Sequence, residues 1–326
     1  MTAHEQREVG VSVKKAILYY FSGCGNTNFI ANQTSQTLVE QGYEVELFDI
    51  EQNPEYKKSD LCGFLFPIYG FGIPQLVVKF LKKLPNTQGQ KSFIFLTPAG
   101  HEGIGIVQTL ALLNSKKFDV ITAQTMFMPD TWTLVQNAPT DEEYNEYSSN
   151  ANDDIKKHIS EIIENKKNIK IAHFFWLVLL GGIYLLFYFI GRHQAGKCFC
   201  ANSNCTECKI CVETCPSKTI QWKKNKPYWS WNCQQCYRCL NTCPTNAIEV
   251  SGVGIMTTTL ALFLGAKAYD LMPFFITNKL DDFYPIPQFL CWAGVMISIF
   301  WLTQLYLAQD KSIKWCITKN KIRYKR

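Results

Sequence analysis

The sequence predicts an α/β doubly wound parallel sheet, followed by a small cysteine-rich α+β domain and by apolar helices of the membrane type. Three observations predict this order. Short apolar runs alternate with helical stretches from 14 to 170, ten of the 14 cysteines fall between 198 and 243, and long apolar runs begin at 171, 253 and 286. A chain of 326 residues is also long enough for about two domains.

The strands of the first domain are predicted from apolar runs that end in Gly, Pro or Ser. KKAILYYFS, LCGFLFPIY, KSFIFLTPAG and VITAQTMFMP are typical of buried strands, and EVELFDI alternates as a strand does. Helical character lies between them, at 26–40, 79–83 and 103–113. Strands that alternate with helices favour a parallel sheet covered on both faces. We expect 1–13 to be a polar tail and 141–170 to be one long polar helix that closes the domain.

The stretch FSGCGNT forms the first strand–turn–helix junction. Gly23 and Gly25 allow a tight curl of the backbone, while Ser22, Asn26 and Thr27 supply hydroxyl and amide donors. The helix that follows adds N–H groups and a dipole that favour a phosphate. A Walker loop is excluded because no Lys follows the glycines, and the dinucleotide fingerprint lacks its third Gly. For this stretch alone, a plain tight turn is the alternative interpretation.

Two further loops, PIYGFGIP and TPAGHEG, also follow predicted strands, at the edge where open α/β sheets bind ligands. FSGCGNT resembles the phosphate loop of flavodoxins, Ser/Thr-x-Thr-Gly-Asn-Thr, with Cys24 where that family usually has Thr. The other two loops resemble those that sandwich the flavin ring. The resemblance implies FMN, with Tyr69 as a stacking candidate and His101 either bonded to the ring or facing solvent. The implied flavin-binding residues are Ser22, Gly23, Cys24, Gly25, Asn26, Thr27, Pro67, Tyr69, Gly70, Phe71, Thr97, Pro98, Ala99, Gly100 and His101.

A doubled cysteine motif lies in the second domain, 198–250. CTECKICVETCP and CQQCYRCLNTCP both read C-x2-C-x2-C-x3-C-P and begin 28 residues apart. In such motifs three cysteines bind one cubane and the fourth binds the other. We expect two [4Fe–4S] clusters, with a zinc ribbon as the alternative, and the stretch resembles the bacterial two-cluster ferredoxins. The expected ligands are Cys205, Cys208, Cys211 and Cys243 for cluster 1, and Cys233, Cys236, Cys239 and Cys215 for cluster 2.

The order of the two halves, over about 14–250, resembles the EFR1-family ferredoxins, which are flavodoxin–ferredoxin fusion proteins of anaerobes. The sequence shows no Ser/His/Asp arrangement, paired-carboxylate site or catalytic metal triad. We therefore expect electron transfer with redox partner proteins. The alternative is a flavin-dependent reductase of a small or lipid-soluble acceptor such as a quinone. The net charge of +6 is modest, and no nucleic-acid partner is expected.

The apolar runs predict contact with a membrane. A two-helix hairpin is expected at 253–308 and a basic tail at 309–326, of which residues 311–326 carry seven Lys and Arg and no acid. The positive-inside rule then places the tail and the ferredoxin half in the cytoplasm. The run 171–192 is long enough to cross, but a crossing would separate the flavodoxin half from the clusters by about 30 Å of hydrocarbon. We therefore favour a re-entrant or interfacial helix, or one buried against the hairpin, with both redox domains at the cytoplasmic face of the cell membrane.

Three smaller features complete the expectations. The polar N-terminus lacks the apolar core of a cleaved secretory signal, so none is expected. The clustered cysteines indicate a metal-cluster module in a reduced compartment rather than a disulfide scaffold. Cys198 and Cys200 precede the doubled motif and are assigned to neither cluster. They are either an accessory metal pair or free thiols near the membrane, open to acylation.

Overall fold

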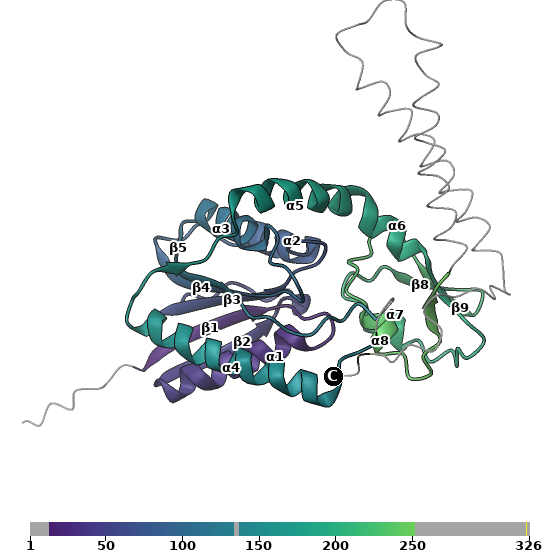
Figure 1. Ribbon diagram of the computed structural model, residues 1–326, viewed down its shortest axis with the longest axis horizontal. Coiled ribbons are helices and arrows are strands. Elements are labelled where there is room, and N and C mark those ends of the chain that lie inside the picture. Colours follow the sequence, from purple (N-terminus) through teal and green to yellow (C-terminus); the bar gives the residue numbers. More distant parts are fainter. Residues whose placement is uncertain (1–12, 134–136, 252–323, 325–326) are drawn as a thin grey trace, which may run out of the picture. The chain divides into compact units, whose positions relative to one another are not determined.

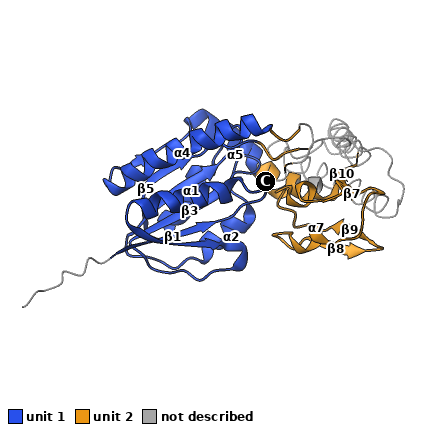
Figure 2. Cartoon of the chain, turned by 90° about the horizontal axis from the view of Figure 1, so that it is seen from below, with its two compact units in different colours: residues 1–129, 140–184 blue, residues 130–139, 185–326 orange. Residues whose placement is uncertain are grey.

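The computed structural model of the chain describes residues 13–133, 137–251 and 324. Two compact units result, one of residues 1–129 and 140–184 and one of residues 130–139 and 185–326 (Figure 2). The division departs from the expected domain limits in two places, because 130–139 groups with the cysteine-rich unit and 171–184 with the α/β unit. The predicted hairpin and almost all of the predicted polar and basic tails lie outside the described residues.

The first unit is built on a six-stranded sheet in which every neighbouring pair of strands is parallel. Its order, β2-β1-β3-β4-β5-β6, begins with the 2-1-3-4-5 order of the flavodoxin-like doubly wound fold. The predicted fold class of this half is therefore confirmed. The strands are β1 (Lys14–Tyr20), β2 (Tyr43–Asp49), β3 (Leu61–Pro67), β4 (Gln90–Thr97), β5 (Phe118–Thr125) and β6 (Asn168–Ile169).

Helices cover both faces of this sheet (Figure 1). The core of one face contains residues of α1 (Asn26–Glu40) and α4 (Asp141–Ile163), and the core of the other contains residues of α2 (Gln75–Lys83) and α3 (Gly105–Ser115). A short 3-10 helix, η1 (Ile50–Gln52), follows β2. Because the strands are buried on both sides, most of them are continuous apolar runs.

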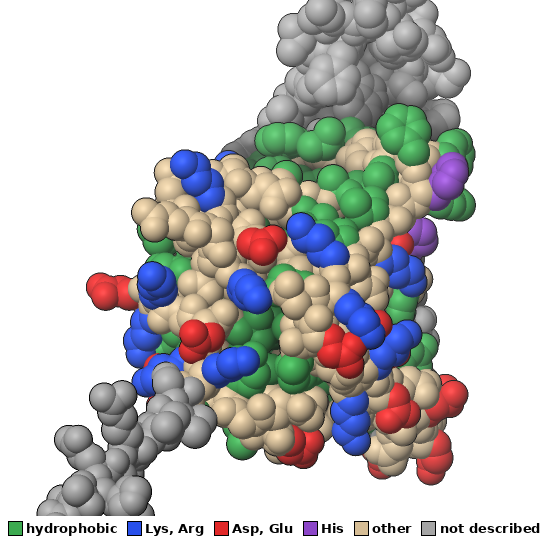
Figure 3. Space-filling model, turned by 90° about the vertical axis from the view of Figure 1, so that its left-hand side faces the viewer, with side chains coloured by type: hydrophobic (Ala, Val, Ile, Leu, Met, Phe, Trp, Pro, Cys, Tyr) green, Lys and Arg blue, Asp and Glu red, His purple; other side chains and the backbone are tan. Residues whose placement is uncertain are grey.

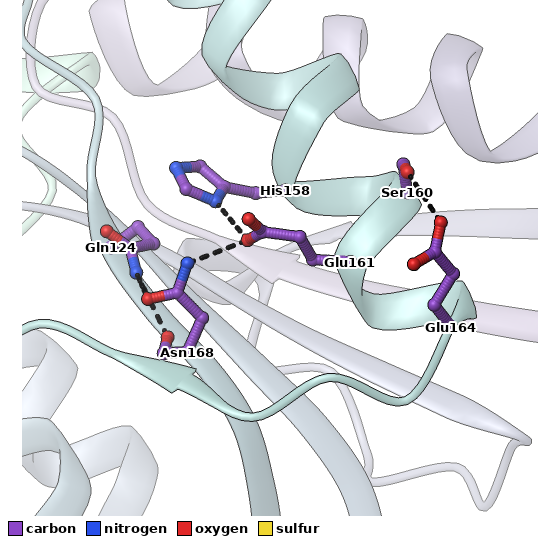
Figure 4. Close-up of polar contacts among 6 residues, drawn as sticks. All are labelled: Gln124, His158, Ser160, Glu161, Glu164 and Asn168. Atoms are coloured by element: carbon purple, nitrogen blue, oxygen red, sulfur yellow. Dashed lines mark hydrogen bonds and ion pairs between the residues drawn. The ribbon is translucent and has the colours of Figure 1, made fainter.

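The expected helix at 141–170 is wrong in its last part. The helix ends at Ile163, and β6 then pairs with β5. Polar side chains fix this small strand (Figure 4): Glu161 Oε2 lies 2.8 Å from His158 Nδ1 and accepts from Asn168 Nδ2 at 2.7 Å. Gln124 Nε2 donates to the carbonyl and side-chain oxygens of Asn168, at 3.0 and 2.8 Å. A two-residue strand held by side chains has no periodic pattern that a sequence reveals.

The second unit is a small α+β domain. Strand β7 (Phe199–Ala201) pairs antiparallel with β10 (Ile248–Val250), and β8 (Ile220–Lys223) forms a hairpin with β9 (Lys226–Trp229). Two one-turn helices, α7 (Ile210–Glu213) and α8 (Arg238–Asn241), follow corresponding positions of the doubled motif. The core packs Phe199, Ile220, Trp229, Leu240 and Ile248 between these elements.

The apolar run at 171–192 is not one regular helix. It contains α5 (Phe174–Leu186), a π-helical turn η2 (Phe187–Gly191) and the start of α6 (Arg192–Lys197). The Gly181-Gly182 pair lies inside α5, so the irregularity falls after the glycines rather than at them. Among the described residues, no helix combines the length and the apolar character that crossing a bilayer requires.

Candidate cofactor sites

The loop after β1 is shaped to receive an anion at the start of α1. Gly25 caps the helix with φ of 110°, which favours glycine, and its N–H donates to Ser22 Oγ at 3.0 Å. The first turn reads Asn-Thr-Asn-Phe, without a carboxylate that would repel a phosphate. The hydroxyls of Thr27 and Thr97 are buried and lie 2.6 Å apart, which joins this loop to the end of β4. Cys24 lies half-buried in the loop.

The loop after β3 makes a tight two-residue turn. Tyr69 N–H donates to Gly72 O at 2.8 Å, and Gly72 N–H donates back to Tyr69 O at 3.3 Å. The two central residues, Gly70 and Phe71, have φ of 56° and 74°, as a type I′ turn requires. A Phe at positive φ is strained, and such strain gathers at ligand sites. The turn thus holds Tyr69 half-buried, with its ring edge-on to Phe21.

The loop after β4 is attached to that turn. Ile104 N–H donates to Phe71 O at 2.8 Å. Gly103 has φ of 55°, and a Cβ there would lie 2.1 Å from Phe71 O, so only glycine permits this approach. His101 Nδ1 accepts from Gly103 N–H at 3.0 Å, and its ring packs beside Phe71 and Trp176. One nitrogen of His101 is therefore used within its own loop.

These contacts bring the three predicted flavin loops to one edge of the sheet. The Thr27–Thr97 pair links the first loop to the third, and the Phe71–Ile104 bond links the second to the third. Pro67 ends β3, Pro98 O accepts from Met128 N–H, and Ala99 and Gly100 complete the third loop. A helix start without a side-chain cap, close to a strained turn that carries Tyr69, fits the phosphate and the ring of a flavin nucleotide.

Eight cysteines of the second unit lie in two groups of four, each drawn from both copies of the motif. Burial, together with the neighbouring thiols Cys208, Cys243 and Cys205, raises the pKa of Cys211 to about 11. Burial likewise raises the pKa of Cys239 well above its ordinary value, with contributions from Cys236, Cys233 and Cys215. Thiols in such surroundings ionise only when a cation compensates the negative charge, as iron does.

The first group lines an open cavity together with Trp222 and Pro227 of the β8–β9 hairpin. Within the described residues, no three His, Cys, Asp or Glu side chains converge as ligands of a single metal ion. A [4Fe–4S] cubane requires a wider arrangement of ligands, because each of the four cysteine thiolates binds a different iron at a different corner.

The backbone repeats as closely as the cysteines do. Left-handed residues recur 28 positions apart in the two copies, although none of them is glycine. Alternating left- and right-handed residues make N–H concavities that are typical of iron–sulfur sites. Each such residue costs of order 1–3 kcal/mol, so the recurrence of the same three positions shows that the two copies adopt the same backbone. The pairs, with their φ values, are Glu207 (59°) and Gln235 (57°), Lys209 (58°) and Tyr237 (56°), and Lys218 (49°) and Asn246 (51°).

Unpaired buried polar atoms also fit a cluster. The indole N–H of Trp229 is buried without a partner among the described residues, and the indole lies beside Cys239, whose pKa it lowers against the effect of burial. A buried donor left unpaired is costly, and N–H donors to cluster sulfurs are common. Gln235 Nε2 already donates to Cys233 Sγ at 3.4 Å. The sequence did not point to Trp229 or Gln235, because only folding brings them to the sulfurs.

The start of the second unit covers Cys233. A Cβ at Gly196 would lie 2.3 Å from Cys233 Cβ, so α6 approaches this cysteine as closely as glycine allows. Gln235 Nε2 also donates to the carbonyl of Arg192 at 3.3 Å. Cys198 is buried and Cys200 half-buried, at the adjoining strand β7.

Comparisons with known proteins agree with this division. Residues 204–248 match the model of a family described as a 4Fe-4S dicluster domain, which indicates an iron–sulfur cluster. No curated protein matches the chain. Among solved structures, the chain is similar to a flavodoxin from the domain Archaea (16% identity, 45% of this chain and 99% of that chain, TM-score 0.33). It is also similar to a flavodoxin of Streptococcus pneumonia TIGR4 (14% identity, 44% of this chain and 99% of that chain, TM-score 0.32). A third similar structure is the flavodoxin of Megasphaera elsdenii (20% identity, 42% of this chain and 98% of that chain, TM-score 0.31).

The fold assignment rests on the strand order, since these TM-scores are below 0.5. The strand order and the family match together describe a fusion of two redox modules. This chain joins a flavodoxin-like α/β domain to a 4Fe–4S domain, and that combination supports electron transfer.

Proposed function

We propose that this protein is a membrane-associated electron-transfer protein of the EFR1 type that binds FMN and two [4Fe–4S] clusters. The proposal rests mainly on the grouping of the cysteines, in which each set of four takes cysteines from both copies of the motif. The other half of the same chain has a flavodoxin-like sheet. When bound, FMN exchanges two electrons one at a time and each cluster exchanges one. Redox partner proteins supply and accept these electrons.

In this proposal the loop from Ser22 to Thr27 holds the FMN phosphate, and the loops around Tyr69 and His101 hold the ring. Cluster 1 is held by Cys205, Cys208, Cys211 and Cys243, and cluster 2 by Cys233, Cys236, Cys239 and Cys215. The buried Trp229 indole supplies an N–H donor close to Cys239. The chain's own contribution is to hold each cofactor in place and to tune it by burial and hydrogen bonds.

Membrane association is supported by the outer side of α5. Leu180 and Tyr184 are buried, while large apolar side chains of the same helix are exposed, from 42% at Ile183 to 75% at Phe174. In Figure 3, hydrophobic side chains gather along the upper edge, where Figure 1 has α5, whereas charged side chains are scattered over the rest of that face. A helix that is packed on one side and apolar on the other is suited to lie in a membrane interface. The exposed set is Phe174, Phe175, Trp176, Val178, Leu179, Ile183, Leu185 and Leu186.

The side chain of Asn241 joins three segments of the cysteine-rich unit. Asn241 of α8 donates through Nδ2 to Thr131 O at 3.1 Å and accepts at Oδ1 from Thr133 Oγ1 at 2.9 Å. These threonines follow β5 of the α/β domain within a few residues. Asn241 Oδ1 also accepts from the N–H of Tyr324, in the basic tail, at 2.8 Å. The positive-inside rule assigns that tail, and hence the unit that contains it, to the cytoplasm, and we propose the same side for the α/β unit.

The electron-transfer proposal is tested by reductive titration of the protein, purified anaerobically in detergent. We expect flavin absorbance and iron–sulfur EPR signals to change in the same molecule, with electrons passing between them. Independent titration of the two cofactor types, without exchange, would contradict the proposal.

The topology is tested by labelling Cys316 and a cysteine introduced in the N-terminal tail, from each side of sealed vesicles. We expect both to react from the same side. Labelling from opposite sides would contradict the arrangement, because it requires an odd number of crossings between the two positions.

The alternative, a flavin-dependent reductase of a lipid-soluble acceptor, is favoured by one observation. The apolar helix α5 lies against the third flavin loop, where Trp176 and His101 have ring centroids 5.7 Å apart. An acceptor dissolved in the membrane would therefore reach the flavin edge along α5. Turnover of a lipid-soluble quinone, lost on Trp176→Ala with clusters intact, would support this function over the carrier.

A further inference from the structure

The buried side of α5 contacts the turn that carries Tyr69. Tyr184 is 4% exposed, and its hydroxyl donates to Ile73 O at 3.1 Å. The same hydroxyl accepts from Gln108 Nε2 at 2.9 Å, and Gln108 Oε1 accepts from Ile73 N–H at 3.0 Å. Both backbone polar groups of Ile73 are thus bound by side chains, in a closed set of three hydrogen bonds from α3 and α5.

The ring of Tyr184 completes this contact. A Cβ at Gly72 would lie 2.3 Å from a ring carbon of Tyr184, so the ring lies directly on the glycine backbone. Gly72 is the residue that pairs with Tyr69 across the turn. Tyr184 therefore packs on one end of the turn and bonds to the residue that follows it.

A second contact on the same helix reaches the third flavin loop. Trp176 lies beside His101, whose ring in turn lies beside Phe71. Trp176 and Tyr184 are eight residues apart, which is about 12 Å along a helix. One helix thus contacts both of the loops that the proposed function assigns to the flavin ring.

We propose that α5 is a structural part of the flavin site, with Tyr184 and Gln108 as positioning residues that fix the Tyr69–Gly72 turn for the flavin ring. This rests on the proposed function and names residues that the flavodoxin-like loops alone do not include. The turn is strained at Phe71, so it needs support from outside the loop to keep its conformation. A turn that is already in its bound form binds FMN more tightly, because less ordering remains to be done on binding.

The test compares Tyr184→Phe with wild type and with Tyr147→Phe, a matched change at an exposed position of α4. The full chain in detergent is used throughout. Two quantities are measured: FMN affinity, from quenching of flavin fluorescence, and hydrogen exchange at the amide of Ile73. Tyr184→Phe keeps the ring on Gly72 and removes only the hydroxyl. We expect about tenfold weaker FMN binding, as for one or two lost hydrogen bonds, and at least tenfold faster exchange at Ile73. Tyr147→Phe should change neither quantity.

Gln108→Leu is the second variant and guards against misfolding of the first. It should reproduce both effects, and the double variant should add little, because the two side chains belong to one network. Normal affinity in both variants would overturn the inference, whether or not exchange at Ile73 rises. Wild-type protein that binds no FMN would contradict the proposed function instead. In that case, an unchanged rate of hydrogen exchange at Ile73 in both variants would also show that Tyr184 and Gln108 do not hold the turn.

Discussion

The two copies of the cysteine motif share a sequence pattern and a backbone, yet they differ in exposure. In the first copy Cys205 is half-buried and Cys208 is exposed, whereas their counterparts Cys233 and Cys236 are buried. Burial raises the pKa of Cys233 to about 12. Solvent exposure and hydrogen bonds to sulfur are two of the factors that set cluster potentials. Within the proposed function, the first two cysteines of each copy give cluster 1 the more exposed surroundings and cluster 2 the more buried ones, and we propose that cluster 1 is the one that exchanges electrons with partners.

The difference arises from what covers each copy. Gln235 is 2% exposed and bonds both to Cys233 and to the carbonyl of Arg192, and Gly196 of α6 lies on Cys233. The corresponding residue of the first copy, Glu207, is exposed. The chain that leaves α5 therefore covers Cys233, while Cys205 and Cys208 of the first copy line an open cavity.

The largest effect is expected from Gly196→Ala. The added Cβ would lie 2.3 Å from Cys233 Cβ, and neither backbone can yield easily. Iron content should fall from about eight toward four per chain, with loss of the cluster 2 EPR signal. Gly182→Ala is the matched control, because a Cβ there meets no described atom within 4 Å. Full iron content in Gly196→Ala would show that α6 does not cover cluster 2.

A second expectation concerns iron removal. A chelator should take iron from the exposed cluster 1 at least tenfold faster than from cluster 2, because opening is needed to reach the buried thiolates. Absorbance at the chelator band should therefore rise in two phases of similar size. A single phase would mean that the two clusters are equally accessible and would remove the basis of the comparison.

A smaller effect is expected from Gln235→Leu, which removes the N–H donor to Cys233 while keeping similar volume. Such a donor stabilises the more negative, reduced cluster. Its loss should lower the potential of cluster 2 by roughly 20–60 mV, from about 0.5–1.5 kcal/mol per hydrogen bond. Glu207→Leu in the first copy removes a negative charge rather than a donor, so it should raise the potential of cluster 1 instead of lowering it. Equal shifts in the two variants would argue that Gln235 has no special role.

The smallest effect is expected far from the clusters, at Glu161. Hydrogen bonds from His158 and Asn168 hold the pKa of Glu161 below its usual value of 4.5. A lowered pKa in the folded state stabilises the fold fully above pH 4.5, and this contribution is lost only as pH falls further. Between pH 7 and 5, Glu161→Gln should thus lower stability by a constant amount, under about 1 kcal/mol, measured by circular dichroism. Iron content should not change. A difference that grows with pH across this window would contradict the assignment.

The sequence correctly predicted those elements of the fold that depend on short-range patterns of apolar residues. The strands β1 to β5 and the helix α1 follow from apolar runs and their spacing, and the cysteine spacing alone predicts the crossed ligand sets. The strand β6 was missed because it is held by hydrogen bonds to Gln124, which is distant in the sequence, and to Glu161, which lies in the preceding helix. The grouping of 130–139 with the second unit depends on Asn241, a contact across more than 100 residues.

The three predicted flavin loops also show which features can be predicted from local sequence and which depend on the tertiary structure. The three loops were predicted from glycines and strand ends, but the hydrogen bonds that join them were not. Tyr184 belongs to a run whose composition indicates only membrane contact, and nothing in that run shows that one hydroxyl bonds to Ile73. The close approaches at Gly72, Gly103 and Gly196 likewise need the tertiary structure to be recognised.

The central claim is tested most directly by the cofactor content of the protein, purified anaerobically. Iron, acid-labile sulfide, zinc and FMN are measured per chain in one preparation. The account predicts about eight iron, about eight sulfide, one FMN and no stoichiometric zinc. Zinc in place of iron, iron near four per chain, or a preparation that takes up no flavin would contradict it.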